Sequence, residues 1–328
     1  MSIRFAVFGS GGVGGYFGGR LAQTGHDVTF IARGAHLTAM KQQGLRVKSP
    51  LGDFHLQPVK ASSSAQEVGP VDVVLVAVKA WQVPAAAETI QPLLGKNTFV
   101  LPLQNGVEAP SQLASVLGEQ RILGGLCKII SLVAEPGTIH HLGAEPYIAL
   151  GELSGDLTPR CEKLAAALRG AGIKVDIPVG GDDTSGIEAA MWQKFLFIAA
   201  VSGIGAVTRA PLGTVRELPE TRALLVAAMQ EIVQVARALK IPLADGIIEK
   251  TLAFLDSLPP ETTASMQRDL MEGRPSELEH QNGAVVRLGL QTGVKTPVNT
   301  TLYASLLPME RQARARQEGS PSDPTPRT

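Results

Sequence analysis

A glycine-rich motif that directly follows a short apolar run is the feature that most constrains the fold of this chain. Residues 3–8 are mostly apolar, and six residues of the pattern G-x-G-x-x-G come next. Glycines at this spacing permit a tight turn after a strand, close approach of the backbone to a pyrophosphate, and close packing of a helix on the strand. The free N–H groups at the start of that helix favour an anion. The sequence therefore predicts an N-terminal strand, turn and helix that bind a dinucleotide through Gly9, Ser10, Gly11, Gly12, Val13 and Gly14.

The residue after the second expected strand indicates which dinucleotide is bound. Residues 26–32 are expected to form this strand, and Arg33 follows them. NAD enzymes usually place Asp or Glu here to accept hydrogen bonds from the ribose, whereas a guanidinium suits the 2′-phosphate of NADP. We therefore expect NADP as the cofactor, with Arg33 at its 2′-phosphate. The alternative, that Arg33 is only a solvated loop cation, stays open.

Length, charge and cysteine content narrow the class of protein. The 328 residues exceed what one hydrophobic core usually serves, so two domains are expected. Acidic and basic residues balance at 30 each, which removes any bulk electrostatic argument for nucleic acid or an anionic membrane. The two cysteines lie far apart without metal-ligand spacing, so we expect no metal site and a reducing, cytoplasmic compartment. No apolar run is expected to reach the length of a membrane span, and we expect small-molecule partners.

The first half of the chain alternates short apolar runs with helical patterns, as α/β folds do. Residues 71–78, 98–102 and 121–132 are expected to be strands, and the first of these is apolar enough for a parallel strand buried on both faces. Residues 138–142 and 147–150 are expected to finish the same sheet as antiparallel strands. A helix over residues 159–170 and a last strand over residues 174–177 should follow.

After residue 182 the pattern becomes almost wholly helical. The main helices are expected over residues 187–201, 220–239, 245–258 and 276–290. The last eleven residues hold three prolines and no apolar side chains to bury, which predicts disorder. The predicted fold class is α/β, with a Rossmann-like doubly wound sheet and a second, all-helical domain. The predicted domains are residues 1–182 for NADP binding, 183–317 for substrate binding and catalysis, and 318–328 as a disordered tail.

Three segments carry polar groups of the kind that a dehydrogenase needs near a nicotinamide, and we expect them to face the crevice between the two domains. Asn105 comes after an apolar strand, at the edge where open α/β sheets bind ligands, although Asn-Gly is also a strong turn dipeptide. Lys194 is the single cation within the apolar residues 190–198. Burial and the helix dipole lower the pKa of a lysine and make it a better proton donor, and the alternative is a lysine whose stem only covers apolar surface. For Ser265 and Glu277 the spacing alone indicates no more than a solvated helical face.

The order of motifs over residues 3 to about 312 resembles that of the ketopantoate reductase (2-dehydropantoate 2-reductase) family of NADPH enzymes. The resemblance rests on the glycine motif, Arg33, Glu277 and the segments AVKAWQ at 77–82, LQNG at 103–106, WQK at 192–194, SMQRD at 265–269 and PVNT at 297–300. It implies reduction of ketopantoate to pantoate in cytoplasmic pantothenate biosynthesis, and it leaves a homodimer open. It implies that Lys79 lies near the cofactor, that Asn105 contacts cofactor and substrate, that Lys194 donates the proton, that Ser265 holds the substrate carboxylate, and that Glu277 contacts the cofactor and orients the substrate.

The chain departs from this family on the helix of the expected proton donor. Members carry asparagines four, eight and eighteen residues after the lysine, where this chain has Ile198, Ser202 and Leu212. Steps of four and eight return to one helical face, so Ile198 and Ser202 are expected to point the same way as Lys194. The pocket then lacks amides that would bind a hydroxylated 2-oxo acid, while the Ser202 hydroxyl remains an expected substrate contact. Reduction of ketopantoate, reduction of a more apolar 2-oxo acid, and a non-catalytic dinucleotide-binding module all stay open.

Overall fold

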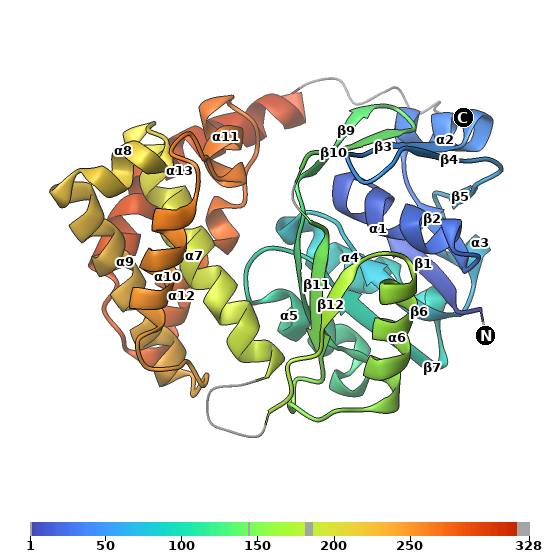
Figure 1. Ribbon diagram of the computed structural model, residues 1–328, viewed down its shortest axis with the longest axis horizontal. Helices are drawn as coiled ribbons and strands as arrows, with labels where there is room; N and C mark the ends of the chain where they lie inside the picture. Colours follow the sequence, from blue (N-terminus) through green and yellow to red (C-terminus); the bar gives the residue numbers. More distant parts are fainter. Residues whose placement is uncertain (1, 144, 181–185, 320–328) are drawn as a thin grey trace. The chain divides into compact units, whose positions relative to one another are not determined.

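The computed structural model describes residues 2–143, 145–180 and 186–319 (Figure 1). They divide into two compact units, Met1–Met191 and Trp192–Thr328, and each unit is described by itself. The boundary predicted between residues 182 and 183 lies outside the described residues. The final helix reaches Gly319, two residues into the predicted disordered tail, and residues 320–328 also lie outside the described residues.

The first unit is built on a five-stranded sheet in the order β5-β2-β1-β6-β7, and all four neighbouring pairs are parallel. The predicted Rossmann-like sheet is therefore confirmed. The strands are β1 (Arg4–Phe8), β2 (Asp27–Ile31), β5 (Lys60–Ser62), β6 (Val71–Val76) and β7 (Leu94–Pro102). The connecting helices are α1 (Gly12–Gln23), α2 (Gly34–Gln43), α3 (Ala65–Val68), α4 (Val83–Thr89) and α5 (Ala109–Leu117), with short 3-10 turns η1 (Ala80–Gln82), η2 (Gln91–Leu93) and η3 (Glu119–Arg121).

Both faces of this sheet are buried. Successive side chains of a strand point to opposite faces, so each strand contributes to the packing on both of them. On β1, Phe5 and Val7 join an apolar cluster that includes Phe17 of α1. Ala6 and Phe8 join a second cluster on the other face, with side chains of α3, α4 and α5. Helices thus cover both faces, which is why the central strands read as nearly continuous apolar runs.

The expectation that residues 138–142 and 147–150 complete the main sheet is wrong. They form β10 (Thr138–His141) and β11 (Tyr147–Gly151), which belong to two further sheets, and each has one antiparallel and one parallel neighbour. Strand β8 (Gly124–Lys128), which precedes them, packs closely on the end of β7 without extending the main sheet: a Cβ atom at Gly125 would lie 2.5 Å from the Pro102 carbonyl oxygen. Among the described residues, an isolated bridge from Val100 to Ile122 joins this segment to the main sheet.

The two smaller sheets account for the remaining strands of the unit. The four-stranded sheet has the order β4-β3-β10-β9, and the three-stranded sheet has the order β12-β11-β8. Their other strands are β3 (Leu45–Lys48), β4 (Phe54–Leu56), β9 (Ser131–Glu135) and β12 (Lys174–Asp176). The predicted helix over residues 159–170 is confirmed as α6 (Pro159–Gly170). Both cysteines, Cys127 and Cys161, are thiols buried in the core of this unit.

In the second unit, all regular elements among the described residues are helices, as predicted. The helices are α7 (Ile187–Thr208), whose first turns belong to the first unit, α8 (Leu212–Glu217), α9 (Pro219–Ala238), α10 (Ile247–Ser257), α11 (Ser265–Met271), η4 (Leu278–His280), α12 (Asn282–Thr292) and α13 (Pro297–Gly319). The helix expected over residues 276–290 begins only at Asn282, because the N–H and hydroxyl of Ser276 bind the Glu310 carboxylate instead of entering a helix.

Helix α7 corrects one expectation about membranes. Its 22 residues are long and apolar enough to cross a bilayer by length and composition, although no apolar run was expected to reach that length. Two-thirds (67%) of its most apolar stretch is buried inside the protein, as in a core helix. The helix also continues past the predicted end at residue 201, since Gly203 and Gly205 admit neighbouring side chains rather than ending it.

Candidate functional site

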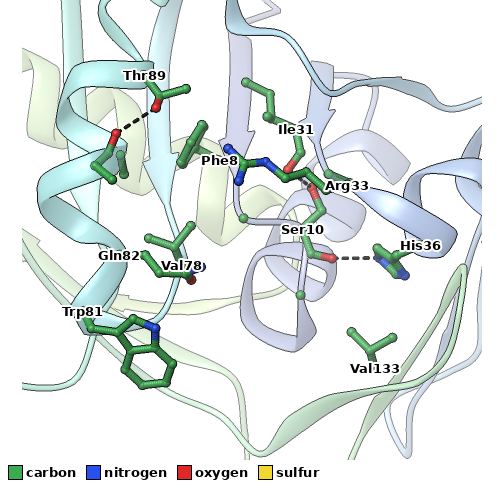
Figure 2. Close-up of a pocket in the computed structure, with 15 residues that line it drawn as sticks. Phe8, Ser10, Ile31, Arg33, His36, Val78, Trp81, Gln82, Thr89 and Val133 are labelled. Carbon is green, nitrogen blue, oxygen red and sulfur yellow. Dashed lines mark hydrogen bonds between the residues drawn. The ribbon is translucent and has the colours of Figure 1, made fainter. Parts of the chain in front are cut away.

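A cavity of about 450 Å³ opens beside the carboxyl ends of β1 and β2, within the first unit (Figure 2). The glycine-rich loop between β1 and α1 lines it through Gly9, Ser10 and Gly11. The segment from the end of β2 into α2 contributes Arg33 and His36. The remaining walls come from the segment after β6, from α4, and from Val133 of β9. The motif and the residue after the second strand, paired in the sequence analysis, thus meet in one cavity.

Glycine is required at three positions of the loop, because neighbouring atoms approach each of these positions closely. Gly9 has φ +95°, and a Cβ atom there would lie 2.7 Å from the Val78 main-chain nitrogen. A Cβ atom at Gly12 would overlap the carbonyl of Ser131 in β9, and one at Gly14 would overlap the carbonyl of Gly9. By contrast, nothing lies within 4 Å of a Cβ position at Gly11. The loop is therefore fixed by its surroundings, and Gly11 is the position where it faces open space.

The other motif residues have structural tasks. Ser10 is buried, and its hydroxyl donates to the Ile31 carbonyl at 3.0 Å. Its own carbonyl lies 2.9 Å from His36 Nε2. Val13, on the first turn of α1, packs against the apolar cluster beneath the sheet. A ligand contact by Ser10 would therefore fall to its main chain.

Arg33 provides the positive charge of the cavity. It is exposed and is the N-cap residue of α2, with an extended backbone and no side-chain capping bond. Among the described residues, no hydrogen bond or ion pair engages its guanidinium, and no carboxylate lines the cavity. Burial lowers the pKa of His36, although its bond to Ser10 acts in the opposite direction, so His36 adds little charge near neutral pH. The acidic residue of β2, Asp27, lies at the far end of the strand and pairs with Lys60 at 2.8 Å.

The segment after β6 forms a wall that the residue patterns alone did not identify. Trp81 and Gln82 line the cavity, and they belonged only to the family resemblance. Lys79 is exposed at the start of η1, where its main-chain N–H donates to Gln82 Oε1 at 3.2 Å. Its ammonium lies 5.8 Å from the centre of the Trp81 ring. Lys79 is thus next to a wall residue without being one of the lining residues itself.

Asn105 lies three residues after β7, at the carboxyl end of a parallel strand as predicted. Gly106 has φ +96°, so the Asn-Gly pair is also a turn. The preceding Gln104 is buried, and its Nε2 donates to the carbonyls of Val76 at 2.9 Å and Val78 at 3.0 Å. Gln104 therefore ties the ends of β6 and β7 together and fixes the segment that carries Asn105. Sequence reasoning missed this role.

Lys194 lies on the second turn of α7 in the second unit and is half-buried among apolar neighbours. Ile198 is half-buried one turn later, and Ser202 is buried one turn after that. Because the helix is continuous, the expected shared face of these three residues follows from its periodicity. Phe197, beside Ile198, meets Phe254 of α10 edge to face with ring centres 5.4 Å apart. The residues of α7 that directly follow Lys194, from position 195 to 201, are all apolar.

Helix α11, which begins at Ser265, packs on the face of α7 that carries Lys194. Gly205 is eleven residues beyond Lys194, about three full turns along the same face. A Cβ atom at Gly205 would lie 2.5 Å from Gln267 Oε1 on α11. Gln267 is held in place, since its Nε2 donates to the Ala210 carbonyl at 2.9 Å. Ser265 itself is exposed.

Glu277 is buried, with 6% of its surface exposed, so the solvated helical face is the wrong reading for this residue. The neighbouring Ser276 donates its main-chain N–H at 2.9 Å and its hydroxyl at 2.6 Å to the Glu310 carboxylate. Arg314 binds Glu310 at 2.6 Å and donates to the Ser276 carbonyl at 3.1 Å. Two side chains of α13 thus fix the main chain directly before Glu277. Leu212, which stands where members of the resembled family have an asparagine, is buried at the start of α8.

Comparison of the sequence with known protein families shows to which family this chain belongs. Residues 5–155 match the family described as ketopantoate reductase PanE/ApbA, and residues 186–310 match the C-terminal part of the same family. The chain belongs to the ketopantoate reductase family. The matched residues include the glycine-rich loop, Arg33, Lys79, Asn105, Lys194 and Glu277, and the family is one of oxidoreductases.

Individual relatives extend over nearly the whole chain. The uncharacterized oxidoreductase YkpB of Bacillus subtilis is 33% identical, covering 93% of this chain and 98% of its own. A protein named 2-dehydropantoate 2-reductase from Mesorhizobium japonicum is 32% identical, covering 92% and 96%. The crystal structure of a PanE/ApbA family ketopantoate reductase from Ralstonia eutropha is 31% identical, with a TM-score of 0.85 and coverage of 95% and 100%. The protein is therefore similar to them along nearly its whole length.

Proposed function

We propose that the protein is an NADPH-dependent reductase of a 2-oxo acid, with reduction of ketopantoate to pantoate as the first candidate reaction. The observation that carries the proposal is the cavity in which an unpaired Arg33 meets a glycine-rich loop fixed on three sides. Family membership and the relatives named 2-dehydropantoate 2-reductase support the reaction class. A small-molecule substrate and a cytoplasmic enzyme belong to the same proposal.

The residues present fit NADPH. The start of α1 supplies main-chain N–H groups for the pyrophosphate, and the open space at Gly11 accommodates it. The Arg33 guanidinium suits the 2′-phosphate through charge and its fork of donors. Lys79, Asn105 and Glu277 are further proposed cofactor contacts, on the basis of their motif positions. When bound, NADPH supplies the hydride.

Lys194 is the proposed general acid. Hydride addition to a ketone leaves an alkoxide oxygen, and a positioned ammonium can bind the carbonyl oxygen and then protonate it. Lys194 is the only titratable side chain in residues 191–201. We assign Ser265 to the substrate carboxylate, Ser202 to a substrate hydroxyl, and Asn105 and Glu277 to substrate orientation.

The substitutions on α7 favour a second candidate function, the reduction of a more apolar 2-oxo acid. Ile198 offers hydrocarbon one turn from Lys194, beside Phe197, which meets Phe254 edge to face. An apolar wall cannot bind a substrate hydroxyl through donors, so discrimination for ketopantoate over its deoxy analogue would be weak. A non-catalytic dinucleotide-binding module is the remaining alternative, and the retained Lys194, Asn105 and Glu277 of the family motifs speak against it.

The decisive experiment measures NADPH oxidation with ketopantoate and a panel of branched and aromatic 2-oxo acids. Lys194→Ala should lower turnover about a hundred- to ten-thousandfold, the usual cost of losing a positioned acid, with NADPH affinity nearly unchanged. Lys250→Ala, at an exposed position of α10, is the control and should keep full activity. Wild-type turnover in Lys194→Ala would refute the assignment, and a wild-type protein that binds NADPH but reduces no 2-oxo acid would establish the non-catalytic alternative.

A further inference from the structure

His36 joins three separate segments around the cofactor cavity. It lies on the first turn of α2, three residues after Arg33, and its side chain points at Ser10 (Figure 2). The main-chain N–H of Gly137 donates to its Nδ1 at 3.0 Å, so the ring proton resides on Nε2. Nε2 then donates to the Ser10 carbonyl at 2.9 Å. Both ring nitrogens are therefore used within the protein.

The third segment, the β9–β10 hairpin, is a wall of the cavity. Val133 of β9 lines it, and Ser131 lies so close to the start of α1 that only glycine fits at position 12. The hairpin turn also presses on α2, since a Cβ atom at Gly137 would lie 3.1 Å from the Ala39 side chain. Among the described residues, no other side-chain hydrogen bond joins this turn to α2 or to the glycine-rich loop.

This bridge is one of the contacts that set the distance between two anion-binding elements, beside the bonds of Ser10 and Gly9 to the Ile31 carbonyl. One element is the glycine-rich loop with the start of α1, and the other is Arg33 with the start of α2. Because no described group bonds to the Arg33 guanidinium, the main chain of residues 33–36 sets the region that this side chain can reach. A ligand with phosphates at both elements binds tightly only when their separation is fixed beforehand. A ligand without the 2′-phosphate uses only one of them.

We propose that His36 is a positioning residue that sets the preference for the 2′-phosphorylated cofactor, by bridging Ser10 and Gly137 and so fixing Arg33 relative to the glycine-rich loop. This inference rests on the proposed function. It assigns no chemical step to His36. Removing the bridge should therefore weaken NADPH binding more than NADH binding and should leave turnover at saturating NADPH unchanged.

The test compares three variants of the full-length protein. His36→Ala removes both bonds, His36→Gln keeps an amide nitrogen near the place of Nε2, and His36→Asn keeps an acceptor near the place of Nδ1. Dissociation constants for NADPH and NADH are measured by titration, together with KM and kcat. We expect His36→Ala to weaken NADPH about tenfold, the effect of one hydrogen bond of ordinary strength, and NADH less than about threefold. Each amide variant should recover part of the loss, with kcat unchanged throughout.

A matched control separates this role from general stability. His55 Nε2 also bonds to the main chain of α2, at Gln43 and 2.6 Å, but His55 is exposed and does not line the cavity. His55→Ala should leave both affinities unchanged. Equal weakening of NADPH and NADH in His36→Ala, or unchanged NADPH affinity, would overturn the inference while leaving the proposed function intact. A wild-type protein that binds neither cofactor would instead refute the proposed function.

Discussion

Arg33 shows what a single residue contributes to the cofactor cavity. Its guanidinium has no counter-ion among the described residues, so the field that it projects into the cavity is not cancelled by the protein. A partly exposed cation of this kind costs the fold little, since water still solvates it. When a phosphate replaces part of that water, the guanidinium forms charge-assisted hydrogen bonds, which are stronger than hydrogen bonds between neutral groups.

Replacing Arg33 by Ala should therefore remove much of the preference for NADPH over NADH. We expect a loss of about 1–3 kcal/mol in NADPH binding, the range for a hydrogen bond to a charged group, and little change for NADH. Calorimetric titration with both cofactors measures the difference. Lys41→Ala, at an exposed position near the other end of α2, is the control for a simple loss of positive charge. Equal affinities for both cofactors in the unchanged protein would remove the basis for this expectation.

For single residues, the sequence predicted where a site residue lies in the fold better than it predicted whether that residue is buried. It placed Asn105 at the end of a parallel strand and gathered Gly9 and Arg33 in one cavity, because both follow from strand order. It could not show that Glu277 is buried, since the carboxylate that orders the preceding residue belongs to Glu310, 33 positions away from Glu277. Such a contact leaves no local pattern.

Among the elements, α7 departs most from its sequence pattern. The predicted helix ends at residue 201, yet α7 continues to Thr208, and its glycines beyond residue 201 accept side chains from neighbouring elements. Asn282 of α12 lies against Gly203, and Gln267 of α11 lies against Gly205. Strands β3 and β4 were missed for a different reason. They are short, and β3 alternates buried with exposed residues over only four positions, which is too few for a periodic signal.

A pair of glycine replacements tests the packing of α11 on α7. Gly205→Ala should destabilise the protein by about 1–3 kcal/mol, the usual cost of overpacking, because the buried Gln267 is bonded at both ends and cannot move aside. Gly170→Ala, in α6, has open space around the new methyl group and should be neutral or stabilising by up to about 1 kcal/mol. Urea unfolding of both variants measures the difference. Equal stabilities would show that α11 can shift to accommodate the methyl group.

On the scale of the whole molecule, the change of pattern near residue 182 predicted a sheet-containing part and a helical part. Both are present, and the compact units meet at residues 191 and 192, inside α7. Hydrophobic periodicity cannot locate such a boundary, since a helix that passes from one unit to the next keeps the same repeat. The subdivision of the strands into three sheets was equally out of reach, because it depends on pairings between strands distant in the sequence, such as β3 with β10.

Cofactor binding should be visible as a gain in the stability of the whole chain. A ligand that binds only the folded protein at a hundredfold excess over its dissociation constant adds about 2.7 kcal/mol. NADPH should therefore raise the unfolding temperature more than NADH at the same concentration, and Arg33→Ala should reduce the difference. Differential scanning calorimetry at several cofactor concentrations checks this. A shift that is identical for both cofactors would indicate that the 2′-phosphate is not recognised.

The burial of both native thiols makes the chain a ready scaffold for an optical sensor. Cys127 and Cys161 are shielded in the core, so a maleimide dye would find no accessible thiol on the folded protein. Ala85 lines the cavity from α4 and is exposed, and Ala85→Cys would give the dye one defined attachment point at its rim. The emission of that dye would then report in real time when the cavity fills and empties.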